Sequence, residues 1–120
     1  MTNENWPVDG EIDIIENVHS STSNQVAFHT NPGGCLSARD IISNTFEGCM
    51  LTPGNFSGVA GGLNCDATIN YNIGCGIVDA SVASFGETFN AKGGGIYAMK
   101  WDSDSIDICK HTINIFCSYG

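Results

Sequence analysis

The chain has 120 residues, which is enough for one small domain with a modest hydrophobic core. Its 4 Lys and Arg residues face 13 acidic ones, and the net charge of −9 argues against nucleic-acid binding, because contacts to phosphates need basic side chains. No segment is long and apolar enough to cross a membrane. The charge instead suits an uncharged substrate that is handled by carboxylates.

Short β-like segments alternate with turn signals along the whole chain. Strands are predicted at residues 11–18, 25–29, 76–83, 95–101 and 105–109. We predict at most one helical turn, at Ala38–Ser43, within the loop-rich segment 35–75. The 15 Gly and the many Ser, Thr and Asn residues leave little sequence that favours helices. The pattern therefore predicts an all-β protein with antiparallel strands.

The six Cys residues accompany only three His residues, and no two Cys have the Cys-x-x-Cys spacing of a zinc site. We therefore expect no metal and no other cofactor, and we interpret the even number of Cys as disulfide bonds formed in an oxidising compartment. The segment 35–75 holds Cys35, Cys49, Cys65 and Cys75, which allow three pairings. The polar start Met1–Asn5 conflicts with secretion, because it lacks the apolar stretch of a signal peptide.

The first predicted strand carries three acids, Glu11, Asp13 and Glu16. Simple alternation would place Glu16 on the opposite face, among isoleucines, and burying an unpaired carboxylate costs several kcal/mol. A β-bulge between Asp13 and Glu16 removes this conflict, because one extra residue returns Glu16 to the face of the other two acids. Ile12, Ile14 and Ile15 would then point toward the core. The sequence therefore predicts a bulge beside a row of carboxylates.

The spacing of these acids indicates a type of chemistry. With the bulge, Glu11 and Glu16 are about 13 Å apart along a strand that rises roughly 3.3 Å per residue. If each side chain leans inward by about 4 Å, the carboxyl groups lie roughly 5 Å apart, as in retaining glycosidases. Repulsion between the acids raises the pKa of at least one, and Asp13 can orient its neighbour. The alternative interpretation is a solvated acidic edge strand.

A longer pattern surrounds the three acids. It reads Trp6-Pro7-x-x-Gly10-Glu11-Ile12-Asp13-Ile14-Ile15-Glu16 and continues through Asn24-Gln25-x-x-Phe28-His29-Thr30, Asn64-Cys65-Asp66, Gly74-Cys75-Gly76 and Gly93-Gly94-Gly95-Ile96-Tyr97-Ala98-Met99-x-Trp101. These motifs resemble glycoside hydrolase family 16, and more narrowly its laminarinase-like fungal endo-1,3(4)-β-glucanases. The resemblance covers about residues 5–108 and leaves 109–120 as a divergent tail.

The resemblance implies a role for each matching residue. Glu11 would be the nucleophile, Asp13 the assisting acid and Glu16 the general acid/base. Trp6 would form a sugar-stacking wall, with a buried core Trp as the alternative. His29 would hydrogen-bond the substrate or Glu16, with a structural His at a strand end as the alternative.

The resemblance also implies an antiparallel β-sandwich, a concanavalin A-like jelly roll, about twice as long as this chain. We therefore expect residues 1–120 to be a partial catalytic domain of a secreted protein, either an internal fragment or a gene model cut at both ends. Trp101 is expected in the core.

The reading that combines these observations is a monomeric, retaining endo-β-glucanase that binds and hydrolyses 1,3- or mixed 1,3/1,4-β-glucans without a cofactor. One alternative is a cell-wall glucan transglycosylase, against which Ile15 counts because such relatives usually lack the bulge. The other alternative is an inactive, glucan-binding or truncated remnant, because missing strands leave open sheet edges.

Overall fold

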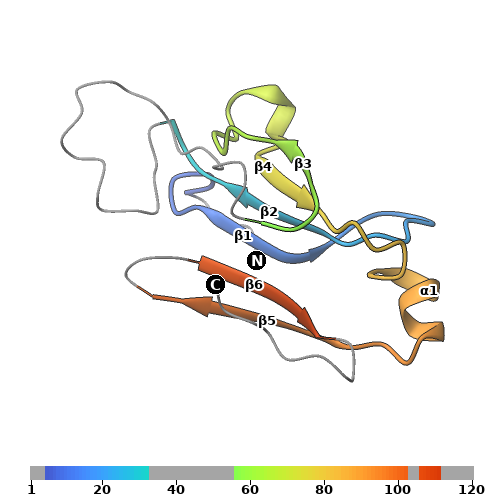
Figure 1. The fold of residues 1–120 in the computed structure, drawn as a ribbon. Coiled ribbons are helices and arrows are strands. Elements are labelled where there is room, and N and C mark those ends of the chain that lie inside the picture. Colours follow the sequence, from blue (N-terminus) through green and yellow to red (C-terminus); the bar gives the residue numbers. More distant parts are fainter. Residues whose placement is uncertain (1–4, 33–55, 103–105, 112–120) are drawn as a thin grey trace.

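The computed structural model describes residues 5–32, 56–102 and 106–111 (Figure 1). Its elements are β1 (Glu11–Glu16), β2 (Gln25–His29), β3 (Val59–Gly62), the 3-10 turn η1 (Asn70–Asn72), β4 (Cys75–Val78), α1 (Gly86–Ala91), β5 (Ile96–Trp101) and β6 (Ile106–His111). The strands form a four-stranded sheet of order β1-β2-β4-β3 and a two-stranded sheet of β5 and β6. All of these pairs are antiparallel, so the predicted all-β antiparallel class is confirmed.

The edge strand β1 contains the predicted bulge. Asp13 pairs with Ala27, and the next paired residues are Glu16 and Gln25. Three steps along β1 therefore correspond to two steps along β2, so β1 absorbs one extra residue. The prediction drawn from the burial cost of Glu16 is confirmed.

The centre of the four-stranded sheet is formed by β2 and β4, and small side chains fill the space around it. The buried apolar residues among those described are Ala27, Cys65, Ala67, Cys75 and Ala83. A disulfide joins Cys65 to Cys75 at the start of β4, which identifies one of the pairs that the sequence left open. Cys35 and Cys49 lie outside the described residues, as do Ala38–Ser43.

The second sheet is the hairpin of β5 and β6, which lies beside β1, while α1 lies between β4 and β5 along the chain (Figure 1). Neither α1 nor β3 was expected from the sequence. The helix has only six residues, too few for a recognisable period. β3 contains two glycines, which weaken a strand signal; a Cβ at Gly62 would lie 2.9 Å from the carbonyl oxygen of Gly74.

Two expectations about the core are wrong. Ile15 is 56% exposed and Trp101 is 59% exposed. Ile14 and Ile15 lie within the bulge, where the alternation of side chains is broken, so the direction of Ile15 does not follow from its position. Trp101 ends β5, whose other residues apart from Tyr97 are also exposed. No helix among the described residues is long and apolar enough to span a membrane.

Candidate active site

The first acid of the row, Glu11, is held by the turn that precedes β1. The indole Nε1 of Trp6 donates a hydrogen bond of 2.7 Å to Oε2 of Glu11. Gly10 makes this turn possible, because its φ of 72° suits glycine and its N–H donates to the carbonyl oxygen of Pro7 at 3.0 Å. Trp6 remains 38% exposed, so it contacts the nucleophile candidate while part of its ring faces solvent.

The second acid, Asp13, pairs with His29 on the neighbouring strand. Nε2 of His29 lies 3.2 Å from Oδ2 of Asp13, and the imidazole is buried at 7% exposure. Its Nδ1 is buried and has no hydrogen-bond partner among the described residues. An N–H on Nε2, with Nδ1 unprotonated, therefore fits these surroundings best. The partner found for His29 is Asp13, whereas the sequence suggested the substrate or Glu16.

Gly74 allows His29 to occupy this position. A Cβ at Gly74 would lie 2.7 Å from Nδ1 of His29 and 2.5 Å from the carbonyl oxygen of Phe28, closer than real Cβ contacts. The φ of Gly74 is also 65°, in the left-handed region that favours glycine. The buried imidazole therefore packs against bare backbone.

Electrostatics single out Asp13 among the three acids. Burial raises the pKa of its carboxyl above the ordinary value, and the negative charges of Glu11 and Glu16 raise it further, while His29 partly offsets this. The repulsion expected from the sequence therefore contributes to the raised pKa of Asp13, but burial is its largest cause.

One ligand atom each from Glu11, Asp13 and His29 lies within 4.8 Å of the others, as a metal site would also require. Nε2 of His29 is already hydrogen-bonded to Asp13, so the arrangement is explained without an ion.

The third acid, Glu16, lies on the far side of the bulge, with an exposed side chain. Its backbone N–H donates to Oδ1 of Asn24 at 3.1 Å, and Nδ2 of Asn24 donates to the carbonyl oxygen of Ile14 at 3.0 Å. Asn24 belongs to one of the motifs quoted above, but the sequence did not indicate a function for it. The only signal was its position directly before β2.

The arrangement has the parts that cleavage of a glycosidic bond requires. Carboxylates on one edge strand can supply a nucleophile and a general acid, and a partly exposed indole beside them can stack on a sugar ring. The arrangement is therefore compatible with a class of enzymes that cleave carbohydrates.

A family model described as "XgeA-like, catalytic GH16 domain" matches residues 1–114. The chain belongs to glycoside hydrolase family 16.

Curated relatives agree with this family. The chain is 39% identical over 105 residues to a probable glycosidase of Schizosaccharomyces pombe, covering 86% of this chain and 22% of that protein. It is 36% identical over 104 residues to a probable endo-1,3(4)-beta-glucanase of Aspergillus flavus, covering 87% and 13%. The endo-1,3(4)-beta-glucanase xgeA of Emericella nidulans is 34% identical over 108 residues, with coverage of 86% and 14%. The chain therefore spans less than a quarter of these relatives.

Solved structures support the fold. Laminarinase 16A of Phanerochaete chrysosporium, solved with β-glucans in donor and acceptor sites, matches with a TM-score of 0.74 and 32% identity, covering 92% of this chain and 32% of that one. An elongating family 16 β-1,3-glucosyltransferase matches with a TM-score of 0.65 and 30% identity, covering 88% and 30%. The resemblance to a laminarinase-like jelly roll, drawn from the motifs, is confirmed.

Proposed function

We propose that residues 1–120 carry the catalytic strand of a retaining endo-β-glucanase that hydrolyses 1,3- or mixed 1,3/1,4-β-glucans. The observation that carries this proposal is the bulge between Asp13 and Glu16, which lets acids on both sides of it serve one substrate site. The curated endo-1,3(4)-beta-glucanases support the substrate class. The row of acids supports the double-displacement mechanism.

In this mechanism Glu11 attacks the anomeric carbon while Glu16 donates a proton to the leaving oxygen. A covalent glycosyl-enzyme forms, and Glu16 then removes a proton from the water that hydrolyses it. Asp13 lies between Glu11 and Glu16 in the sequence and is held by His29. It can therefore share a proton with the carboxylate of Glu11 as the charge on Glu11 changes during the reaction. The raised pKa of Asp13 is consistent with this assisting role.

Trp6 would position the sugar beside Glu11. The hydrogen bond from Nε1 to Oε2 of Glu11 fixes the indole at the edge of the site, and the exposed part of the ring is available for stacking on a pyranose. The same bond orients the carboxylate of Glu11 toward attack. His29 contributes indirectly, through Asp13.

Two isosteric substitutions test the proposal. Glu11→Gln and Glu16→Gln should each lower the hydrolysis of laminarin and lichenan at least about 10³-fold, because each removes a group that reacts with substrate. Release of reducing ends measures the rate, and ¹H NMR of the first product shows whether the anomeric configuration is retained. Glu87→Gln, on the exposed face of α1, is the matched control and should leave turnover unchanged. Near-parental hydrolysis by both site variants would exclude this assignment.

A transglycosylase is the second candidate, since the chain is 30% identical to an elongating β-1,3-glucosyltransferase. The bulge at Ile14–Ile15 counts against it. Incubation with laminarin oligosaccharides distinguishes the two, because transfer lengthens the chains whereas hydrolysis only shortens them.

We also propose that the protein acts outside the cell as a monomer. The Cys65–Cys75 disulfide supports an oxidising compartment. Localisation of the tagged protein in its native host, and its mass in solution under non-reducing conditions, test the two statements.

A further inference from the structure

Asn24 makes an unusual pair of contacts across the bulge. It is 1% exposed, and its side chain bonds to the backbone on both sides of Ile15: Oδ1 accepts from the N–H of Glu16, and Nδ2 donates to the carbonyl oxygen of Ile14. A backbone N–H can only donate and a carbonyl can only accept. The orientation of the amide is therefore determined, and a carboxylate at this position could satisfy only one of the two partners.

The backbone N–H and carbonyl oxygen of Asn24 are also hydrogen-bonded. Its N–H donates to Oγ of Ser84 at 2.8 Å, and its carbonyl oxygen accepts from the N–H of Asp79 at 2.9 Å. These bonds join the start of β2 to the segment that connects β4 and α1. Asn24 thus cannot shift toward or away from the bulge without breaking contacts elsewhere.

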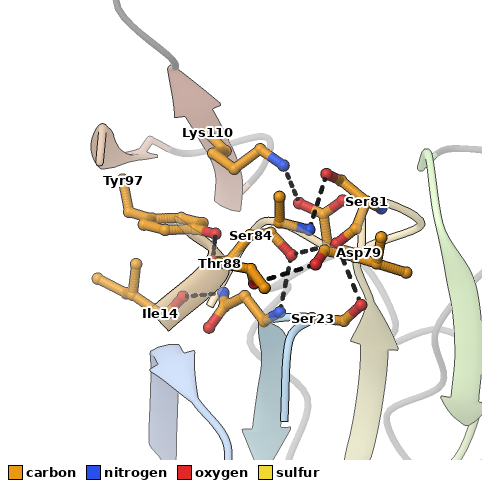
Figure 2. Close-up of polar contacts among 11 residues, drawn as sticks. Ile14, Ser23, Asp79, Ser81, Ser84, Thr88, Tyr97 and Lys110 are labelled. Carbon is orange, nitrogen blue, oxygen red and sulfur yellow. Dashed lines mark hydrogen bonds and ion pairs between the residues drawn. The ribbon is translucent and has the colours of Figure 1, made fainter. Parts of the chain in front are cut away.

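These contacts continue to the second sheet through Ser84 and Tyr97. The hydroxyl of Tyr97, on β5, donates to the carbonyl oxygen of Ser84 at 2.5 Å, and Oγ of Ser84 donates to the carbonyl oxygen of Ser81 at 2.8 Å (Figure 2). Figure 2 shows these contacts gathered around Ser84, with Ile14 at one side of the group. A continuous chain of hydrogen bonds therefore runs from the β5–β6 hairpin to the bulge.

From these contacts we infer that Asn24 is a positioning residue that holds the backbone of Glu16 in the geometry needed for proton transfer. A bulge interrupts the hydrogen-bond ladder, so the N–H of Glu16 needs another acceptor, and Asn24 provides it. The direction of the Glu16 side chain follows from this backbone, and a displacement of about 1 Å can lower a rate about 10²-fold. This inference rests on the proposed role of Glu16.

Asn24→Asp is the decisive substitution because it keeps the shape and changes one atom. An ionised Asp would place an oxygen against the carbonyl of Ile14, whereas a protonated Asp could donate to that carbonyl and accept from Glu16. We expect kcat on laminarin to fall roughly 10–100-fold near neutral pH with KM within about twofold. Activity should recover partly at acid pH, which moves the optimum of the variant downward relative to the parent.

Asn17→Asp is the matched control. The Asn17 side chain donates to the carbonyl of Ser23 and accepts from the N–H of Val18 at 2.8 Å, so it belongs to the β1–β2 connection and not to the bulge. Its variant should keep the parental pH profile and kcat. A loss of stability alone would lower activity in both variants, because Asn17→Asp likewise places an oxygen against a carbonyl, that of Ser23.

Amide hydrogen exchange supplies a readout that does not depend on turnover. The Glu16 N–H should exchange at least about tenfold faster in Asn24→Ala, which removes its acceptor, and at the parental rate in Asn17→Asp. If Asn24→Asp does not fold, Ser84→Ala carries the test: loss of the acceptor for the Asn24 N–H should lower kcat roughly two- to fivefold with KM unchanged.

A folded Asn24→Asp with parental kcat and pH profile overturns the inference, as does parental Glu16 exchange in Asn24→Ala or an unchanged kcat in Ser84→Ala. Glu16→Gln is measured in parallel. Full hydrolysis by that variant would refute the role of Glu16, whereas an inactive Glu16→Gln beside a parental Asn24→Asp would refute only the positioning role.

Discussion

At the scale of single residues, the site is assembled at the expense of stability. Asp13 is a partly buried carboxyl between two other acids, and its raised pKa has burial as the main cause and like charges as the second. The contact with Nε2 of His29, at 3.2 Å, offsets only part of this. Such placements are common where chemistry requires charged groups to be close together.

Asp13→Asn should therefore stabilise the protein at neutral pH while lowering its activity. A carboxyl whose folded pKa is raised binds its proton more tightly in the folded state, so its unfavourable contribution grows as pH rises above about 4. Asn removes this charge and still offers His29 an acceptor. We expect the Tm at pH 7 to rise by roughly 1–3 °C, and the gain to disappear as pH falls toward 4.

Thermal unfolding between pH 4 and pH 8 measures this effect, with Glu87→Gln as the control for loss of an exposed carboxylate. A lower Tm for Asp13→Asn at pH 7 would show that the attraction to His29 outweighs burial and repulsion, contrary to our expectation.

At the scale of the elements, glycines shape the space behind β1. Gly74 precedes β4, and the imidazole of His29 and the carbonyl of Phe28 occupy the space where its Cβ would lie. The disulfide between Cys65 and Cys75 closes the loop that ends at this glycine. The position of His29, and through it that of Asp13, therefore depends on Gly74, which lies in the connection between β3 and β4.

Gly74→Ala should destabilise the protein by about 2–4 kcal/mol, through left-handed strain and a clash with backbone that cannot move easily. Gly94→Ala is the matched control, because Gly94 has a φ of 72° and nothing within 4 Å of the added Cβ. It should lose only about 1–2 kcal/mol from strain. Urea unfolding of both variants measures the difference, and similar losses in the two would show that crowding at His29 is unimportant.

The bulge and β2 could be predicted from the sequence, whereas β3 could not. The bulge was predictable because one local conflict, the burial of Glu16, had one local solution. β2 was predicted with its observed bounds because its hydrophobic pattern and flanking residues are local. In contrast, β3 is held by pairing with β4, a partner about 15 residues away in the sequence, and its own residues give little strand signal.

At the scale of the whole molecule, polar contacts between the two sheets link the hairpin to the site. Nζ of Lys110 lies 2.7 Å from Oδ2 of Asp79, and the hydroxyl of Tyr97 donates to the carbonyl of Ser84 (Figure 2). Each contact joins residues 13 or more positions apart, so no periodic pattern or motif indicated them. The sequence indicated the three acids, Trp6 and His29, whereas it did not indicate the contacts that Asn24, Ser84 and Tyr97 make behind them.

The contact between Tyr97 and Ser84 can be tested through the pKa of the Tyr97 hydroxyl. Burial raises the pKa of its hydroxyl to about 12, and the negative charge of Asp79 contributes to the same direction. Between the ordinary pKa near 10 and about 12, the unfolded state loses the proton more readily than the folded state. Stability should therefore fall as pH rises through this range.

Tyr97→Phe should lose about 1 kcal/mol near pH 7, because the carbonyl of Ser84 loses its donor, and its stability should fall less than the parent's between pH 10 and 12. Tyr71→Phe is the control, since Tyr71 is fully exposed. Chemical denaturation at pH 7, 9, 10 and 11 measures both variants. Equal alkaline slopes in the parent and in Tyr97→Phe would show that the hydroxyl of Tyr97 reaches solvent. The hairpin would then be attached to the four-stranded sheet through Lys110 and Asp79 rather than through Ser84.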